Sequence, residues 1–401
     1  MVIDSSIVSE IELHGAEVES EIIKIRRTIH ENPELAYHEI ETASIVEEKL
    51  KTLGFEVRTK VGGTGVVGVL RGKHPGKTVA LRADMDALPI AENTDEPFKS
   101  KKPGIMHACG HDTHVAMLLG AAMILAKMKE KLHGTVKLIF QPAEEDGGRG
   151  GAKPMIEDGA LENPKPDYFF GIHISSDYPS GVLGVHGGPF MARPDAFKIL
   201  IKGRGGHGSQ PWKSVDPIFV GSQVVNSVYA MRSRLFDQRQ PLTISFCMFH
   251  SGTKDNIIPD EASLEGTIRT LDEQFRNIVI EKFSETVSNM AKSYGADVTI
   301  KFTDDPYPVT VNNAKVAETL ARNLALISGV KIFDPEPRMG AEDVSRFLQK
   351  VPGCFYYLGT YNEKKGCTAP NHSSRFKVDE SVLKTGSIAH AISVFSFTQE
   401  H

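Results

Sequence analysis

The chain has 401 residues, of which 40% are hydrophobic and 24% are charged, and its formal net charge is -5. This composition is ordinary for a globular protein; it offers no basic excess for nucleic acid and no apolar run near the roughly 18 residues of a membrane span. The length exceeds the roughly 250–300 residues at which single cores stop growing, so we expect two domains.

The N-terminal segment carries acidic residues and lacks the basic start and apolar core of a signal peptide. The chain has too few cysteines, too widely scattered, for a disulfide framework: Cys109, Cys247, Cys354 and Cys367. We therefore expect a cytoplasmic protein with reduced thiols and with neither a nucleic acid nor a membrane as partner.

Residues 5–53 space their apolar side chains three and four apart and then reach Gly54, which predicts a helix. Residues 114–132 have the same helical pattern. Short apolar runs with the pattern of strands lie at 64–72, 78–84, 135–142 and 167–174. Strands that alternate with helices predict an α/β domain with a mostly parallel sheet flanked by helices. In such sheets active residues gather at the carboxyl ends of the strands.

The pattern changes near residue 191. Between 195 and 305 the order strand–helix–strand–strand–helix–strand predicts a small ferredoxin-like α+β domain. From about residue 307 the first pattern resumes. We therefore expect a catalytic domain formed by 1–190 and 307–401, with a lid or dimerisation domain of residues 191–306 inserted into it.

The stretch "MHACGHDTH" at 106–114 is dense in side chains that bind metals. Cys109 and His111 are separated only by Gly110, so both could face one ion. A soft thiolate and a borderline imidazole suit zinc and its neighbours. Taken alone, however, such a pair is more often a surface loop with a buried cysteine.

Other residues with metal-site chemistry follow the predicted strands. Glu144 and Glu145 come after the strand at 135–142, His173 lies in the apolar run "FFGIHIS", and His372 lies in the loop "APNHSSRF". A metal hydrolase needs one carboxylate to bind the ion and another to take a proton from water. Each signal is weak alone, since paired glutamates are usually solvated and a lone histidine usually belongs to a core. Their shared position at strand ends of one sheet makes them a candidate site.

These motifs resemble the aminoacylase/carboxypeptidase family of di-metal amidohydrolases, in the branch of hippurate and indole-acetyl-amino-acid hydrolases and archaeal thermostable carboxypeptidases. The similarity covers nearly the whole chain. The matching stretches include "RRTIHENPELAYHE" (26–39), "LRADMDALPI" (81–90), "MHACGHDTHVAMLLGAA" (106–122), "IFQPAEEDGGRGGA" (139–152), "GGHGSQP" (205–211), "DNIIPDEASLEGTIRT" (255–270) and "NHSSRF" (371–376).

The resemblance implies two divalent metal ions per subunit, with zinc expected first and cobalt, manganese or nickel as alternatives. It implies that Glu144 is the general base. Asp86 would orient a metal ligand without binding the ion itself. Asp112 would either do the same or bind the ion directly. The role of Asp84 stays open because other branches of the family have histidine at this position. The implied ligands are Cys109, His111, Glu145, His173 and His372.

The resemblance also assigns roles within the inserted domain. His207, in the glycine-rich loop "GGHGS", would stabilise the oxyanion from the partner subunit, which implies a homodimer. Arg269 and Asn256 would bind the carboxylate of the substrate. The alternatives are a turn histidine at 207 and an Arg269 that only pairs with neighbouring acids.

The resemblance therefore implies a broad-specificity metallocarboxypeptidase and N-acyl-amino-acid amidohydrolase, which cleaves N-acyl amino acids and the C-terminal residues of peptides. One alternative is a dedicated deacetylase of hippurate or N-acetyl-diaminopimelate type. Others are a metal-stabilised binding dimer and a cysteine hydrolase that uses Cys109. "GTGVVG" at 63–68 fits a dinucleotide motif, but its continuation as a strand argues against one.

Overall fold

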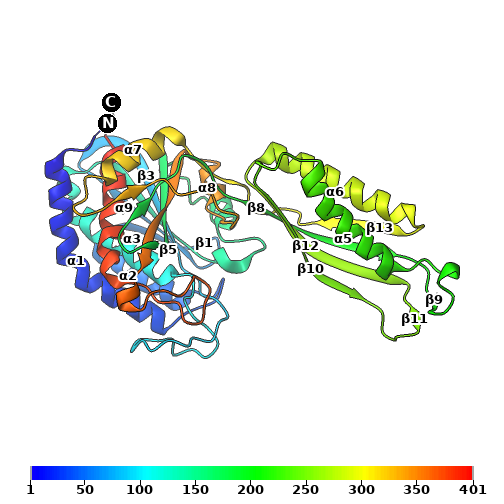
Figure 1. The fold of residues 1–401 in the computed structure, drawn as a ribbon. Coiled ribbons are helices and arrows are strands. Elements are labelled where there is room, and N and C mark those ends of the chain that lie inside the picture. Colours follow the sequence, from blue (N-terminus) through cyan, green and yellow to red (C-terminus); the bar gives the residue numbers. More distant parts are fainter. Residues whose placement is uncertain (1, 400–401) are drawn as a thin grey trace. The chain divides into compact units, whose positions relative to one another are not determined.

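The structure is a computed structural model that describes residues 2–399 (Figure 1). The chain divides into two compact units. The first consists of Met1–Gly188, Val311–Glu336 and Asp343–His401, and the second of Pro189–Thr310 and Pro337–Glu342. The insertion expected from the sequence spans 191–306.

An eight-stranded sheet forms the centre of the first unit. Its strands, in spatial order, are β1 (Glu56–Val61), β2 (Gly65–Arg71), β4 (His133–Gln141), β3 (His74–Asp84), β5 (Tyr168–Pro179), β16 (Gly353–Tyr361), β6 (Leu183–Gly184) and β15 (Ile332–Phe333). The central strands β4, β3, β5 and β16 run parallel to one another, whereas β1 and β2 are antiparallel to their neighbours. The predicted α/β class with a mostly parallel sheet is confirmed.

Helices cover this sheet (Figure 1). The helices of the first unit are α1 (Ser5–Glu31), α2 (Ile40–Thr52), α3 (His111–Lys127), α4 (Ala152–Glu157), α7 (Ala314–Leu324), α8 (Ser345–Leu348) and α9 (Leu383–Phe397). Three of them meet at Gly120 of α3, where a Cβ would lie 2.2 Å from Ser387 Oγ of α9 and 2.7 Å from Ile22 Cδ1 of α1. Glycine therefore allows α3 to pack closely against both neighbours.

The prediction of one helix over 5–53 is wrong, because the chain leaves the helical conformation between Glu31 and Ile40. Pro33 causes the break, since a residue before proline is disfavoured in the helical conformation and proline has no N–H to donate. The intervening segment 32–39 crosses to the edge of the site described below.

The second unit has the element order predicted for a ferredoxin-like domain. Its main elements are β8 (Arg193–Lys202), α5 (Pro217–Arg234), β10 (Leu242–Ser251), β12 (Glu261–Thr270), α6 (Glu273–Ser293) and β13 (Asp297–Phe302). The strands form an antiparallel sheet in the order β10-β12-β8-β13. The Asp216 side chain accepts N–H bonds at the start of α5, and Asp272 does so for α6, which explains where both helices begin.

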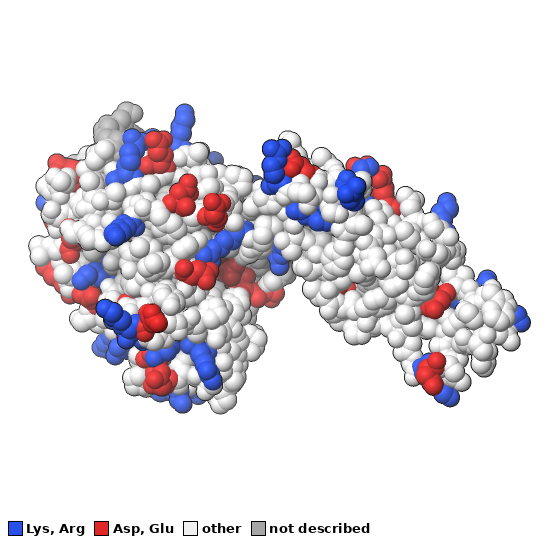
Figure 2. Space-filling model, viewed as in Figure 1, with Lys and Arg blue, Asp and Glu red and all other residues white. Residues whose placement is uncertain are grey.

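Short elements complete the description: β7 (Gly188–Met191), β9 (Gly206–His207), β11 (Ile257–Ile258) and β14 (Thr310–Asn312). Within residues 2–399 no helix is both long and apolar enough to cross a membrane. On the face drawn in Figure 2, lysine and arginine side chains lie among aspartate and glutamate side chains. All four cysteines are free thiols.

Asp379, just before α9, joins three segments of the first unit. Its Oδ1 accepts from Lys365 Nζ at 2.5 Å and Ser381 Oγ at 2.6 Å, and its Oδ2 accepts from Asn362 Nδ2 at 2.7 Å and Ser180 Oγ at 2.6 Å. Burial by itself would raise the pKa of this carboxyl, but the hydrogen bonds outweigh burial and hold the pKa well below its usual range.

We expect Asp379→Asn to lower the free energy of unfolding by about 2 kcal/mol at pH 7, because it disrupts hydrogen bonds to a buried charge. A depressed folded-state pKa contributes stability above the unfolded-state pKa of about 3.9, and this stability is lost as pH falls toward the folded-state value. Urea denaturation of both proteins should therefore give a smaller difference at pH 3 than at pH 7. An equal difference at both pH values would contradict this account.

Candidate metal centre

The predicted site residues of the first unit gather at the carboxyl ends of the central parallel strands. Asp84 ends β3 and is paired in register with Gln141, which ends β4. The turn that follows β4 carries Glu144 and Glu145, and His173 lies on the neighbouring strand β5. Parallel strands bring these carboxyl ends to one edge of the sheet, where active residues of such folds collect.

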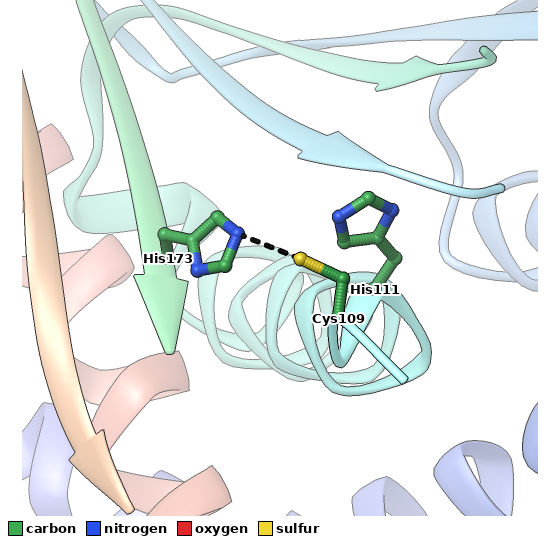
Figure 3. A group of neighbouring side chains, drawn as sticks. All are labelled: Cys109, His111 and His173. Carbon is green, nitrogen blue, oxygen red and sulfur yellow. Dashed lines mark hydrogen bonds between the residues drawn. The ribbon is translucent and has the colours of Figure 1, made fainter. Parts of the chain in front are cut away.

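Gly110 places the motif of closely spaced metal-binding side chains against β5. Its φ is 92°, and a Cβ there would lie 2.2 Å from Ile174 Cδ1, so the position requires glycine. Helix α3 begins at the next residue, His111. Cys109 and His111 consequently lie near His173, with Cys109 Sγ 3.4 Å from His173 Nε2 (Figure 3).

The expected ligands form two groups that share Cys109. The first group is Cys109, His111 and His173, and the second is Cys109, Glu145 and His372. In each group, one possible ligand atom per residue lies within 4.8 Å of the others. In the second group His372 Nε2 lies 3.3 Å from Cys109 Sγ and 3.1 Å from Glu145 Oε1. Two three-ligand groups that share a thiolate could hold a pair of ions.

Unsatisfied buried atoms support a cation at this position. His111 Nε2 is buried and has no hydrogen-bond partner within the described chain, although Asp84 Oδ2 lies 3.5 Å away. Glu145 Oε1 is also buried without a hydrogen bond of good geometry, and it lies 3.1 Å from His372 Nε2. Buried polar atoms are normally satisfied, and thiolate, imidazole and carboxylate donors together suit a borderline-soft divalent ion. The donor set therefore fits such an ion.

The protonation of the ligands also bears on metal binding. Burial raises the pKa of the Cys109 thiol and lowers the pKa of His173. His372 Nε2 lies beside Cys109 Sγ and Glu145 Oε1, and donation of its ring proton to these acceptors raises the pKa of His372 to about 10. A divalent ion must displace the protons on Cys109 and His372, so binding releases protons and is favoured as the pH rises.

Asp86 contacts two of the expected ligands from the side away from the donor atoms. Its backbone carbonyl accepts a hydrogen bond from His111 Nδ1 at 2.9 Å, and its Oδ1 lies 3.3 Å from the same nitrogen. Its Oδ2 accepts the Glu145 backbone N–H at 2.8 Å. These contacts hold the Nδ1 side of the His111 ring against Asp86, so Nε2 is the nitrogen that would bind an ion once it has lost its proton, which is the orienting arrangement expected for Asp86.

Asp112 faces helix α1 instead. Its Oδ2 accepts hydrogen bonds from Arg26 Nε at 2.7 Å and from His30 Nδ1 at 2.9 Å. Neither ligand group contains Asp112. Of the two roles considered from the sequence, the geometry favours an indirect one, in which Asp112 holds the start of α3 against α1.

Sequence reasoning assigned no role to His114, which lies three residues after His111 on the same helix. Its Nδ1 donates to Asp84 Oδ1 at 2.5 Å, and its Nε2 accepts the Ile174 backbone N–H at 3.0 Å. Arg82 Nη1 donates to the other oxygen of Asp84 at 2.8 Å. Both ring nitrogens of His114 are thus occupied. The i, i+3 spacing was the one local signal that His111 and His114 share a helix face.

Asn371 is a second residue that the sequence reasoning missed. Its Nδ2 donates to the Cys109 carbonyl at 3.0 Å, and its Oδ1 accepts from Ser176 Oγ at 2.9 Å. The next residue, His372, has φ of 67°, and its N–H donates to the Ala108 carbonyl at 2.8 Å. Asn371 thereby holds the loop that carries His372 against the segment that carries Cys109.

The predicted residues of the second unit lie on its strands and adjoining loops. His207, on β9, is exposed and paired with Ile257 of β11, and the Ser209 N–H donates to its Nδ1 at 3.1 Å. That bond leaves the ring proton on Nε2, as an oxyanion donor requires. Asn256 is exposed beside β11. Arg269, on β12, is partly buried and forms no ion pair within residues 2–399; burial lowers the pKa of its guanidinium, while the charge of Asp195 raises it.

Comparison with known proteins identifies the family of this chain. The model of "Peptidase family M20/M25/M40" matches residues 80–393. Thermostable carboxypeptidase 2 of Saccharolobus solfataricus is 56% identical over 96% of this chain and 97% of its own length. N-acetylcysteine deacetylase of Bacillus subtilis is 37% identical over 91% of this chain and 94% of its own length.

A solved structure supports the same assignment. The YXEP protein of Bacillus subtilis, described as a dinuclear metal-binding peptidase of the M20 family, superimposes with a TM-score of 0.83 at 34% identity, covering 95% of this chain and 98% of that one. The resemblance inferred from the sequence motifs is confirmed. The chain belongs to peptidase family M20/M25/M40.

Proposed function

We propose that this chain is a metal-dependent carboxypeptidase that also deacylates N-acyl amino acids. The observation that carries the proposal is that Cys109 is shared by two groups of candidate metal ligands, with Glu144 next to them. A hydrolase that uses water as its nucleophile can combine a site for two metal ions with a nearby carboxylate that accepts the proton of the water. The high identity to a thermostable carboxypeptidase supports the substrate class.

A pair of divalent ions would be held by the two ligand groups of the first unit. Zinc suits the mixed thiolate, imidazole and carboxylate set, and cobalt, manganese or nickel are alternatives. When bound, such ions lower the pKa of water and polarise the carbonyl that is attacked. The residues that would hold them are Cys109, His111, Glu145, His173 and His372.

Glu144 would move the proton. Its side chain is only 8% exposed, and its carboxylate lies within 4.8 Å of ligand atoms of His111 and Glu145. The carboxylate takes a proton from the attacking water and then gives it to the nitrogen of the departing amine. Restricted contact with solvent limits exchange of that proton before it reaches the leaving group.

The second unit would supply the remaining contacts with the substrate. His207 would donate its Nε2–H to the oxyanion, and this position on a small β-ribbon is open to a bound ligand. Arg269 would bind the substrate carboxylate through its planar guanidinium, helped by Asn256. Burial already lowers the pKa of Arg269, so an anionic ligand would relieve an unfavourable environment.

We further propose that the chain forms a homodimer through the second unit. Strand β10 is the edge of the antiparallel sheet and pairs only with β12 within the described chain. Exposed apolar side chains line this strand and the adjoining helix α5, namely Met248, Phe249, Ile218 and Phe219. An exposed edge with apolar neighbours favours pairing with a second copy.

We expect His207→Ala to reduce kcat by about 10²- to 10³-fold, because it removes one donor to the oxyanion. If His207 acts on the partner subunit, co-expression of differently tagged His207→Ala and Glu144→Gln chains should restore activity. Each mixed dimer then contains one complete site, so random pairing gives about one quarter of wild-type turnover. Activity no higher than that of either variant alone would show that His207 does not act across the dimer.

The substrate class can be tested with matched free acids and carboxamides. We expect hydrolysis of blocked dipeptides and of N-acyl amino acids, followed as release of free amine, and loss of at least about 100-fold in kcat/KM when the terminal carboxylate is amidated. Arg269→Ala should reduce that discrimination. Hydrolysis of neither class of free acid would contradict the proposal. Hydrolysis of N-acetyl amino acids alone would favour the dedicated deacetylase, a function carried by one of the relatives.

A further inference from the structure

We propose that Glu39 is a positioning residue that holds the loop Ala143–Gly150 in the conformation that presents Glu144. This inference rests on the proposed function, because Glu39 would act through Glu144 and would not touch the substrate. It concerns a buried carboxylate that lies outside both ligand groups.

The loop begins in an unfavourable backbone conformation. Ala143 has φ of 53° and ψ of 39° and is fully buried. This left-handed conformation is disfavoured for a residue with a Cβ and persists only where its surroundings enforce it. Because Ala143 directly precedes Glu144, its backbone direction determines where the catalytic carboxylate lies.

Glu39 supplies the contact that enforces this conformation. Its Oε1 accepts the Ala143 N–H at 2.9 Å and the Tyr37 N–H at 3.0 Å, and its Oε2 accepts from Thr64 Oγ1 at 2.5 Å. The Glu39 side chain is fully buried. These three donors fix the position of the Glu39 carboxyl group, and its bond to the Ala143 N–H is the one that acts on the loop.

Tyr37 holds the other end of the loop. Its hydroxyl donates to the Gly150 carbonyl at 2.6 Å, and its own φ of 63° is left-handed. The segment 37–39 therefore contacts the loop at its first and last residues. Both contacts come from the segment that Pro33 removes from the helical conformation. The break between α1 and α2 therefore allows this segment to reach the loop that carries Glu144.

Besides Ala143, the Glu39 carboxylate accepts hydrogen bonds within residues 2–399 only from Tyr37 and Thr64, and it does not cap helix α2. Glu39 occupies the N-cap position of α2 but makes no side-chain capping bond. The first N–H groups of α2 are accepted by Glu34 instead, which binds the backbone of Glu41 at 3.1 Å and of Thr42 at 2.9 Å. Glu34 is thus a buried acid of the same segment that serves the helix, and it provides a matched control.

Glu145 has its own support, since its N–H is bound by Asp86. Loss of Glu39 should therefore displace Glu144 while the ligands remain in place. The expected signature is a lower kcat with unchanged metal content and nearly unchanged KM. A general loss of folding would instead lower the metal content and the melting temperature together with the apparent kcat.

The experiment compares four variants of the full chain: Glu39→Ala, Glu39→Gln, Glu34→Gln and Glu39→Ala combined with Ala143→Gly. Glu39→Ala should lower kcat per bound metal by about 10- to 100-fold, because small displacements of a catalytic group have effects of this size. Glu39→Gln keeps an oxygen acceptor and should recover most of the loss. Glycine adopts the left-handed conformation without support, so Ala143→Gly should raise kcat of the Glu39→Ala protein on the order of tenfold. Glu34→Gln should leave kcat unchanged.

Amide hydrogen exchange of the metal-free protein gives a readout that does not involve activity. We expect the amides of 143–150 to exchange at least about tenfold faster in Glu39→Ala than in wild type, with the amides of α2 unaffected. If Glu39→Ala does not fold, Tyr37→Phe tests the same loop through Gly150 and should also lower kcat and protection. Unchanged kcat and exchange in the variant that folds, or no recovery with Ala143→Gly, would overturn the inference.

The experiments distinguish a failure of the role proposed for Glu39 from a failure of the proposed hydrolase function. If wild type hydrolyses the substrates and Glu144→Gln does not, the proposed function stands, and a normal Glu39→Ala protein then refutes only the role of Glu39. If wild type hydrolyses none of them, the proposed function fails, while the exchange measurement still reports whether Glu39 holds the loop.

Discussion

Glu144→Gln is expected to lower kcat on the order of 10³- to 10⁴-fold while leaving the fold and the bound metal intact. Glutamine has nearly the same size as glutamate but cannot accept the proton of the attacking water, and general base catalysis contributes rate factors up to this range. KM should change little, because Glu144 would act on the water and the leaving amine and not on substrate recognition. Initial rates, metal content and melting temperature of both proteins give the comparison.

Asp146→Asn is the matched control for that substitution. Asp146 lies two residues further along the same turn, carries the same charge and is exposed. It should retain wild-type turnover, since it belongs to neither ligand group. Near-normal turnover in Glu144→Gln would show that another group takes the proton.

Cys109→Ala should have the second large effect on activity. It would act by weakening metal binding, whereas Glu144→Gln acts by removing the group that accepts the proton. Cys109 belongs to both ligand groups, so its removal leaves two candidate ligands in each. We expect the loss of at least one ion per chain and a decrease in kcat/KM on the order of 10³-fold or more. Metal analysis by mass spectrometry alongside the kinetic assay measures both quantities.

The same variant separates the metal mechanism from a cysteine nucleophile. If Cys109 attacked the substrate itself, Cys109→Ala would abolish activity and the remaining ligands would still bind metal. Cys367→Ala is the control, because Cys367 is also buried but lies outside both groups. Inactive Cys109→Ala protein with a full complement of metal would support the cysteine mechanism.

The sequence was most informative where a local pattern sets the structure. The alternation of strands and helices predicted the parallel sheet, and the residues at its strand ends indicated which side chains meet there. Gly110 and Pro33 act on the backbone within one or two residues of themselves. Pro33 nevertheless did not prevent the prediction of a single helix, because the apolar spacing of α1 and α2 continues across the break.

The supporting contacts were not predictable from local patterns, because they join segments far apart in the chain. Asn371 reaches Cys109 across 262 positions, and Glu39 reaches Ala143 across 104. Neither residue differs in kind from an ordinary exposed polar residue until the fold brings its partner close. The role of Asp84 could not be predicted for a related reason, since a carboxylate at a strand end can bind an ion or hold neighbouring side chains. Asp84 contacts Arg82 and His114 and also lies within 4.8 Å of a ring nitrogen of His111.

The central claim is that hydrolysis depends on a pair of ions held around Cys109. The most direct test strips the protein with a chelator, adds back zinc, cobalt, manganese or nickel singly, and measures bound metal and hydrolysis of a blocked dipeptide in the same samples. We predict that the stripped protein is inactive and that activity returns as metal content approaches about two ions per chain. Full activity in the stripped protein would contradict the claim.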